Sequence, residues 1–160
     1  MVSTKGLEKY YLLGTKKIHV LRDINISIPK AQFVVVGGQS GSGKTTLLNI
    51  ISGIDRATAG DVTVAGESLT SRDEEFLSDF RCNHIGFVFQ SYNLVSTLTV
   101  AENVAFPMEW TRKPSQEIEA RVTELIKTVG LEHRLKHFPS QLSGGEQQRV
   151  VIARALLNSP

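Results

Sequence analysis

The chain has 160 residues, of which 41% are hydrophobic and 21% charged, the length and composition of one soluble globular domain. Its formal net charge is only +2 and its lysines and arginines are scattered, so the basic surface typical of a nucleic-acid-binding protein is missing. Apolar runs such as residues 33–36 are far shorter than the roughly 20 residues of a membrane-spanning helix, and no signal peptide is recognised. The single cysteine, Cys82, excludes a disulfide framework and favours a reducing, cytoplasmic compartment.

The first part of the chain predicts strands around a glycine-rich stretch. Alternating apolar residues predict a half-buried strand within residues 18–28. Residues 33–36 form a continuous apolar run before the glycines, which is the pattern of a buried parallel strand. We expect a helix over residues 45–52, and turn signals on both sides predict a short strand at residues 62–64.

The second part predicts helices around one more strand. Residues 73–80 indicate a short surface helix with acids in its first turn, and residues 84–90 indicate a second buried strand. The clearest amphipathic helix is predicted over residues 115–129, with Gly130 as its C-terminal stop. Strands that alternate with helices predict an α/β domain with a partly parallel sheet.

One stretch between a predicted strand and a predicted helix matches the phosphate-loop pattern G-x-x-x-x-G-K-[ST]. Its residues are Gly38, Gln39, Ser40, Gly41, Ser42, Gly43, Lys44 and Thr45. Glycines let successive backbone N–H groups point inward, and the helix N-terminus adds partial positive charge. Lys44 supplies a charge for the β- and γ-phosphates, and the Thr45 hydroxyl is a suitable ligand for Mg²⁺. Nucleotide binding follows, but kinases, GTPases, helicases and transport motors share this pattern.

A second motif stands at residues 142–148, Leu-Ser-Gly-Gly-Glu-Gln-Gln. Ser143 and Glu146 have the spacing of a capping box, so Ser143 is expected to cap a helix that continues through Leu157. Gly144 and Gly145 leave the first turn of that helix without side chains, which predicts another anion site.

These seven residues resemble the signature sequence of ATP-binding cassette (ABC) ATPases almost letter for letter, and the resemblance covers nearly the whole chain. It implies an α/β fold: a P-loop NTPase core of the ABC type with an N-terminal antiparallel β subdomain and a helical subdomain, incomplete at the C-terminus. Within a single nucleotide-binding domain, we expect the β subdomain and P-loop core at about residues 1–90. The helical subdomain would occupy about 91–140, and the signature motif and its helix 141–160.

The resemblance also implies roles for residues outside the two motifs. Gln90 is similar to the glutamine that contacts Mg²⁺ or the attacking water beside the membrane subunit, so Mg²⁺ would be held by Thr45 and Gln90. Tyr11 resembles the aromatic residue that stacks on the adenine of ATP, with the adjacent Tyr10 as the alternative. Thr46 resembles the residue that reaches the α-phosphate.

The partners are implied by the resemblance too. In the family two such domains pair head to tail, and each signature motif, here Ser143, Gly144, Gly145 and Glu146, closes over the γ-phosphate held by the other chain. We therefore expect a homodimer on a membrane subunit (permease), peripheral on the cytoplasmic face of the inner membrane, with no direct membrane span and no nucleic acid. Residues 87–90, 98–104 and 139–143 look most like ATPases of the lipoprotein-release, macrolide-export and cell-division type.

Three alternatives stay open at this point. The chain could drive a membrane complex that moves no cargo, or belong to a translation-factor relative with two cassettes. A DNA-repair or chromosome-organising ATPase is disfavoured, because only about a hundred residues separate Lys44 from Ser143 and no sustained heptads occur between them.

In the family the chain continues beyond this point with an Asp-Glu strand, an Asp-bearing loop and a histidine, none of which is present in residues 1–160. We therefore expect this chain to bind ATP far better than it cleaves it. Because the continuing strand would lie beside the phosphate-loop strand, residues 1–160 alone are expected to be unstable or prone to aggregation.

Four further patterns are given no functional role. His133 and His137 have the spacing of paired metal ligands but are interpreted as surface histidines, and residues 73–75 as a solvated first helical turn. Trp110 with Phe106 fits either a partner contact or ordinary packing. Residues 30–32, Lys-Ala-Gln, replace the family's usual Gly-Glu and are expected to alter only a turn.

Overall fold

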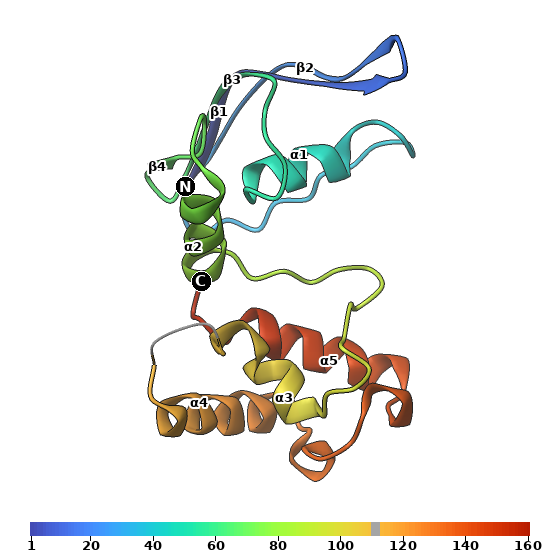
Figure 1. The fold of residues 1–160 in the computed structure, drawn as a ribbon, viewed down its shortest axis with the longest axis vertical. Helices are drawn as coiled ribbons and strands as arrows, with labels where there is room; N and C mark the ends of the chain where they lie inside the picture. Colours follow the sequence, from blue (N-terminus) through green and yellow to red (C-terminus); the bar gives the residue numbers. More distant parts are fainter. Residues whose placement is uncertain (110–112) are drawn as a thin grey trace. The chain divides into compact units, whose positions relative to one another are not determined.

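The computed structural model describes residues 1–109 and 113–160, so Trp110 lies outside the described residues. It forms two compact units (Figure 1). We call them the N-terminal unit (Met1–Arg81) and the C-terminal unit (Cys82–Pro160), and each is described by itself.

The N-terminal unit is built on a four-stranded antiparallel sheet in the order β2-β1-β3-β4. Its strands are β1 (Val2–Leu13), β2 (Lys16–Ile28), β3 (Ala59–Val64) and β4 (Glu67–Ser68). The central strand β1 pairs with β2 and β3 on its two sides, so that Val2 lies opposite both Ile28 and Val64. The predicted strands at 18–28 and 62–64 are confirmed, whereas β1 was not predicted.

The phase of β1 explains why its pattern is hard to recognise. Thr4 and Leu7 are both buried although they are three residues apart, because the register shifts between them where Gly6 has a φ of 54°. The Thr4 hydroxyl donates to the Ile24 carbonyl oxygen at 2.7 Å and accepts from the Ile26 N–H at 3.2 Å, which satisfies a buried polar group inside the sheet.

Two helices accompany this sheet. The helix α1 (Lys44–Ile51) buries Ile50, and α2 (Glu74–His84) buries Leu77 and Phe80. Apolar residues of the sheet and its loops complete the buried set of this unit: Leu7, Leu21, Val62, Val64 and Leu69. Arg81 fastens α2 to the segment after α1, since its guanidinium donates to the Gly53 carbonyl oxygen at 2.7 Å.

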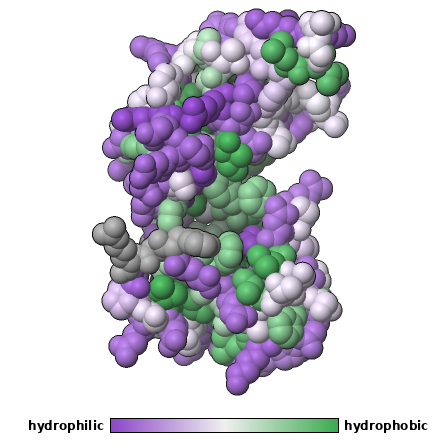
Figure 2. All heavy atoms as spheres, viewed as in Figure 1, coloured by the Kyte–Doolittle hydropathy of each residue, from purple (hydrophilic) through white to green (hydrophobic). Residues whose placement is uncertain are grey.

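The two predicted buried strands are absent from the structure. Residues 33–36 and 85–90 form no ladder, and Phe33 and Val35 are 94% and 76% exposed. Figure 2 shows that hydrophobic residues also lie at the molecular surface elsewhere in the chain. A buried parallel strand requires neighbouring strands, and no strand in the described residues pairs with either segment. The expectation of a partly parallel sheet is therefore wrong for the strands that these residues form.

The C-terminal unit is helical (Figure 1). Its helices are α3 (Val100–Ala105), the 3₁₀ turn η1 (Phe106–Met108), α4 (Ser115–Thr128), the 3₁₀ turns η2 (Glu132–Arg134) and η3 (Pro139–Gln141), and α5 (Gly144–Ala155). The predicted helices at 115–129 and after Ser143 are thus confirmed. Their core is formed by Val100, Val104, Met108, Val122, Leu125, Ile126, Leu131, Leu142, Val150, Ala153 and Leu157.

A single buried amide closes the loop that leads into α3. Asn103 is fully buried; its side-chain oxygen accepts from the Val95 N–H at 2.8 Å, and its NH₂ group donates to carbonyl oxygens of Val95, Leu98 and Thr99. Because every polar atom of this side chain is paired, the loop before α3 is held without a strand or helix of its own.

Candidate functional site

The glycine-rich loop takes a backbone shape that its sequence requires. Gly41 and Gly43 have φ values of 80° and 91°, which L-residues with side chains rarely adopt. A Cβ on Gly43 would also lie 3.0 Å from the Leu21 side chain and 3.2 Å from the Val20 carbonyl oxygen. The loop can therefore pack against β2 only because position 43 is a glycine.

The N-terminus of α1 is left open by this loop. Gly43 occupies the N-cap position, and no side chain caps the helix. The first intrahelical hydrogen bond runs from the Leu47 N–H to the Gly43 carbonyl oxygen at 2.8 Å, so the N–H groups of the first turn have no partner within the helix. Together with the helix dipole, these donors form a site suited to an anion.

Lys44 is the first residue of α1, and its ammonium group lies over the loop. Its Nζ donates to the carbonyl oxygens of Gly38 and Gln39 at 2.9 Å and 2.7 Å and lies 3.4 Å from the Ser42 Oγ. These are neutral acceptors, and the group is exposed, so an anionic oxygen can replace them at little cost.

A pocket of about 460 Å³ opens in front of this helix terminus. It is lined by Val20, Ser40, Gly41, Gly43, Lys44, Thr45 and Thr46, so the structure brings six of the predicted site residues together. Val20 on β2 was missed by the sequence analysis, because nothing in its alternating pattern sets it apart from the other apolar residues of that strand.

Tyr11 is held by residues that are distant from it in sequence, Thr46 of α1 and Asp55. Its hydroxyl donates to Asp55 Oδ2 at 2.6 Å, and Lys9 Nζ contacts Asp55 Oδ1 at 2.6 Å and lies 4.8 Å from the centre of the Tyr11 ring. The hydrogen bond to Asp55, with burial, raises the pKa of Tyr11, while the hydroxyl of Thr46 acts in the opposite direction. Tyr11 is 40% exposed, and its ring is therefore accessible beside Thr46 of α1.

The charge on Asp55 is secured by its neighbours. Burial opposes its ionisation, but the hydrogen bonds from Lys9, Tyr11 and the Arg56 N–H together hold the pKa of this carboxyl below its ordinary value. The Lys9 ammonium and the Tyr11 hydroxyl are thus both anchored on one carboxylate.

The neighbouring Tyr10 is engaged elsewhere. Its ring stacks on His19 with centroids 4.0 Å apart, and Lys17 Nζ lies 3.7 Å from its centre. Its hydroxyl donates to Glu8, and this hydrogen bond raises the pKa of Tyr10. Adjacent residues of a strand point to opposite faces, so Tyr10 and Tyr11 do not present their rings to the same side of the sheet.

The second motif forms a closed helix cap in the C-terminal unit. Ser143 is the N-cap of α5, and its hydroxyl accepts from the Glu146 N–H at 3.3 Å. Glu146 Oε2 accepts from both the N–H and the hydroxyl of Ser143, each at 2.8 Å, and Arg134 Nε donates to Oε1 at 3.0 Å. Ser143, Gly144 and Gly145 are all exposed.

This cap controls the charge at the start of α5. The hydrogen bonds from the Ser143 N–H and hydroxyl, with Arg134 beside them, lower the pKa of Glu146 to about 2. Glu146 is therefore ionised at neutral pH, at the helix end where a negative charge is favourable. The capping box expected from the sequence is confirmed.

Gln90 belongs to the C-terminal unit, where it is exposed in a turn after residues 85–89, which form neither helix nor strand. Two residues with positive φ follow it, Tyr92 at 61° and Asn93 at 49°. This turn is held by Arg154 of α5, which donates to the carbonyl oxygens of Tyr92 and Asn93.

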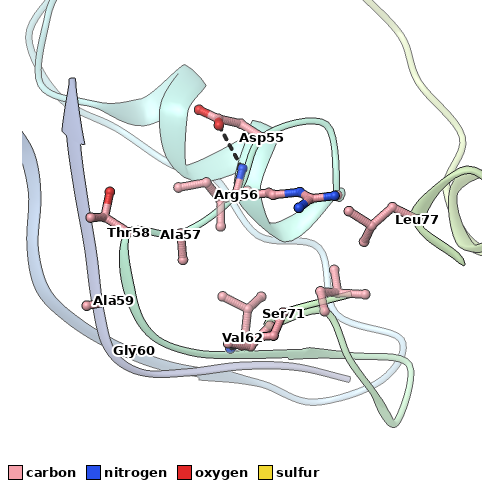
Figure 3. A pocket seen from close by; sticks show the side chains of 13 residues that line it. Asp55, Arg56, Ala57, Thr58, Ala59, Gly60, Val62, Ser71 and Leu77 are labelled. Atoms are coloured by element: carbon pink, nitrogen blue, oxygen red, sulfur yellow. Dashed lines mark hydrogen bonds between the residues drawn. The ribbon is translucent and has the colours of Figure 1, made fainter. Parts of the chain in front are cut away.

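A second, smaller pocket of about 180 Å³ lies in the N-terminal unit (Figure 3). Residues 55–60 form one wall, and Val62, Ser71 and Leu77 lie across from them. Asp55 Oδ1, on its rim, accepts the Arg56 N–H at 2.7 Å. The sequence analysis did not predict this pocket.

The patterns without a predicted function behave as ordinary surface features. His133 lies in the 3₁₀ turn η2 while His137 follows it, so the two do not share one helix face. Across residues 1–109 and 113–160 no group of three or more His, Cys, Asp or Glu side chains could hold a metal ion. Asp73 accepts from the Phe76 N–H at 2.9 Å at the start of α2.

Among the residues that the structure describes, 1–109 and 113–160, no helix has both the length and the apolar content to cross a membrane.

Lys30 and Ala31 lie in a turn, and Ala31 has a φ of 59°. This is a conformation in which glycine is favoured, and the alanine therefore carries backbone strain that a glycine would not.

Known proteins that resemble this chain point to one family. The family model described as "ABC transporter" matches residues 21–160. The macrolide export ATP-binding/permease protein MacB of Mannheimia succiniciproducens is 48% identical over 99% of this chain, which spans 25% of that protein's length. The lipoprotein-releasing system ATP-binding protein LolD of Chromohalobacter salexigens is 44% identical over 100% of this chain, which spans 68% of it.

A solved structure agrees with these relatives. The dimeric ATP-binding cassette MJ0796, in a post-hydrolysis state bound to ADP and Pi, is 41% identical, with a TM-score of 0.90 over 100% of this chain and 71% of its own. This match confirms the fold class that the two motifs imply, an ABC ATPase cassette with an antiparallel β sheet and helices. The chain belongs to the ABC transporter family.

Proposed function

We propose that this chain binds ATP with Mg²⁺ at residues 38–46 and that, in the intact protein, ATP hydrolysis energises an ABC transporter through a partner membrane subunit. The observation that carries the proposal is the pocket in front of α1, where an uncapped helix N-terminus, the Lys44 ammonium and two threonine hydroxyls converge. A nucleoside triphosphate with its Mg²⁺ is the anion that uses all of these groups at once.

Each group of the pocket has a task in this proposal. The N–H groups of the loop and of the first turn of α1 bind phosphate oxygens, and Lys44 exchanges its carbonyl acceptors for the β- and γ-phosphates. Thr45 and Thr46 line the pocket; the first would ligate Mg²⁺ and the second would reach the α-phosphate. When bound, Mg²⁺ would neutralise charge on the phosphates.

The adenine would stack on Tyr11. Its ring is accessible, its position is fixed by Asp55, and Thr46 lies beside its hydroxyl, whereas the ring of Tyr10 is engaged by His19 and Lys17. Stacking recognises a flat π face, so Tyr11 would set the position of the base and contribute little to its identity.

A second copy of the chain would complete the site. The exposed residues Ser143, Gly144 and Gly145 are proposed to close over the γ-phosphate bound by the partner copy. The Ser143 N–H is already used by Glu146, which holds the cap, so the backbone donors in this proposal are the N–H groups of Gly144 and Gly145. The dimeric state of the similar cassette MJ0796 supports this arrangement. Gln90 would contact Mg²⁺ or the attacking water.

The membrane partner is part of the same proposal. Of the similar proteins, one is an export ATP-binding/permease protein and another the ATP-binding protein of a lipoprotein-releasing system. We place this chain on the cytoplasmic face of the cell membrane, attached through a permease. Because the chain spans a quarter of the first relative and 68% of the second, hydrolysis and transport are proposed for the intact protein.

The binding step is tested by titrating the intact protein with ATP and Mg²⁺ in a calorimeter. Lys44→Ala is expected to weaken ATP binding roughly 10- to 100-fold, since it removes a charge-assisted contact. Lys127→Ala, an exposed lysine on α4, is the matched control and should leave the affinity within about twofold. Equal affinities of wild type and Lys44→Ala would refute the proposed site.

A further inference from the structure

The turn that contains Gln90 is fastened to the signature helix α5 by one arginine. Arg154 lies in the last turn of α5 and is partly buried. Its Nη1 donates to the Asn93 carbonyl oxygen and its Nη2 to the Tyr92 carbonyl oxygen, both at 2.8 Å. A guanidinium presents a planar fork of donors, so one side chain can hold two successive carbonyl groups.

The backbone at Tyr92 and Asn93 has an unfavourable conformation that other contacts must stabilise. Tyr92 and Asn93 have φ values of 61° and 49°, a left-handed conformation that is unfavourable for residues with side chains. Short local bonds shape the turn, from the Tyr92 N–H to the Phe89 carbonyl oxygen and from the Asn93 N–H to the Ser91 carbonyl oxygen. From outside the turn, Arg154 donates a hydrogen bond to the carbonyl oxygen of both Tyr92 and Asn93.

Two residues, one on either side of Gln90 in the sequence, lie close to α5, each near one end of the helix. A Cβ on Gly86 would lie 2.3 Å from the Ala155 carbonyl oxygen, so the backbone at 86 touches the C-terminal end of α5. At the other end, the Tyr92 hydroxyl lies 3.7 Å from where a Cβ on Gly144 would stand. Gln90 lies between these two anchor points in the sequence.

We propose that Arg154 is a positioning residue, which fixes Gln90 by tying residues 92–93 to the signature helix, so that a displacement of α5 is passed on to Gln90. This inference rests on the proposed function, in which Gln90 serves the Mg²⁺ or the attacking water. Burial lowers the pKa of Arg154, but an arginine stays charged in proteins, so both of its hydrogen bonds are charge-assisted.

The test is a double-mutant cycle in the intact protein, with Arg154→Met, Gln90→Ala and the double variant. Arg154→Met is expected to lower the kcat for ATP roughly 10- to 100-fold, as removal of a group that orients a ligand does, while the KM for ATP stays within about twofold. In the Gln90→Ala background the same substitution should have almost no further effect, because Arg154 acts through Gln90. Effects that multiply independently would overturn the proposal.

Two further variants separate positioning from folding. Arg121→Met is the matched control, since Arg121 also donates to the end of α5, at the Leu156 carbonyl oxygen, while its other hydrogen bonds go to Glu124 and Ser159. It should leave kcat within about twofold. Arg154→Lys keeps the charge but not the fork, and it keeps the proposal testable if Arg154→Met does not fold. It should lower kcat as well, and full activity of this variant would contradict the proposed role.

Hydrogen exchange of the same proteins gives a readout that does not depend on catalysis. Arg154→Met or Arg154→Lys should speed exchange in peptides covering residues 88–95 by about tenfold or more, and leave α4 unchanged. Unchanged exchange at 88–95 would overturn the inference. If the wild-type protein shows no ATPase activity, the proposed function fails, and the exchange experiment still decides whether Arg154 holds this turn.

Discussion

Two helices of this molecule have glycines at their N-termini, Gly43 at α1 and Gly144 and Gly145 at α5, yet these N-termini differ in what they offer an anion. The first helix, α1, begins at Lys44 without a side-chain cap, beside a lysine ammonium and a pocket of about 460 Å³. The signature helix α5 is closed by the Ser143–Glu146 capping box, and the carboxylate of Glu146, with a pKa of about 2, stands at its start.

The difference teaches that a glycine-rich helix start is not by itself an anion site. At α1, the free N–H groups and the positive charge of Lys44 act in the same direction. At α5, an ionised carboxylate already offsets the helix dipole, so its exposed N–H groups suffice only for an anion that is held by something else. In the proposed function, the first terminus captures a nucleotide and the second closes over one that a partner copy presents.

The largest expected effect comes from Gly43→Ala, which would disturb the open terminus. The substitution combines a left-handed φ with a Cβ only 3.2 Å from the Val20 carbonyl oxygen, so we expect a loss of about 2 to 4 kcal/mol in the free energy of unfolding. Urea unfolding of the intact protein measures it. Gly41→Ala is the control, because it has a similar φ but open space around its Cβ, and it should cost about half as much.

Replacing Tyr11 tests whether the nucleotide at the α1 terminus has its base beside this ring. Tyr11→Ala should weaken ATP binding about tenfold through loss of stacking, while Tyr11→Phe keeps the ring and most of the affinity. Tyr10→Ala should change ATP affinity less than about twofold. A larger loss for Tyr10→Ala than for Tyr11→Ala in the same titration would reverse the assignment of the adenine-stacking residue.

Removing the cap of α5 should convert its terminus toward that of α1. Ser143→Ala removes a hydroxyl that serves both the Glu146 N–H and its carboxylate, and should destabilise the protein by about 1 kcal/mol. The pKa of Glu146 should rise, but only in part, because the Ser143 N–H still donates to it. Nuclear magnetic resonance titration of the Glu146 carboxyl checks this, and an unchanged pKa would mean that the cap does not control the charge.

The same carboxylate gives the cap a defined pH dependence. Its pKa in the folded protein, about 2, lies below the ordinary 4.5, so its contribution to stability is complete above about pH 4.5 and is lost as the pH falls toward 2. Glu146→Gln should flatten this part of the stability profile. We expect a smaller loss in the free energy of unfolding between pH 5 and pH 3 than in wild type, measured by urea unfolding. A profile identical to that of wild type would contradict the role of Glu146.

The smallest effect is expected at Gly145, where the surroundings are open. A Cβ there meets no atom within 4 Å, and alanine favours a helix more than glycine does, so Gly145→Ala should stabilise the protein by about 0.5 kcal/mol. The sign is opposite to that at Gly43. Thermal unfolding of the two variants side by side distinguishes a glycine needed for backbone shape from one needed for access.

The parts of the site that the sequence predicts are those determined by adjacent residues. The loop at 38–45 and the cap from Ser143 to Glu146 are local motifs, and the structure forms both with the expected helices. Tyr11 and Asp55 are 44 residues apart, so their contact depends on how the chain folds. No local sequence pattern predicts it. The carbonyl groups of Asn93 and Tyr92, to which Arg154 donates, are even farther from it in sequence, at 61 and 62 residues.

Strands were harder to predict than helices for a similar reason. A run such as Phe33–Val36 carries the composition of a buried strand, but burial depends on neighbouring strands, and the described residues provide none. Conversely, β1 is a central strand whose alternation changes phase at the bulge near Gly6, so a search for period two does not detect it.

The central claim is that the open terminus of α1 captures ATP without help, whereas the capped terminus of α5 does not. It is tested most directly by titrating ATP and Mg²⁺ into the intact protein at dilutions where it is monomeric, with wild type, Lys44→Ala and Ser143→Ala side by side. We predict that Lys44→Ala loses affinity roughly 10- to 100-fold and that Ser143→Ala binds within about twofold of wild type. Loss of ATP binding in Ser143→Ala, with Lys44→Ala unaffected, would contradict the account.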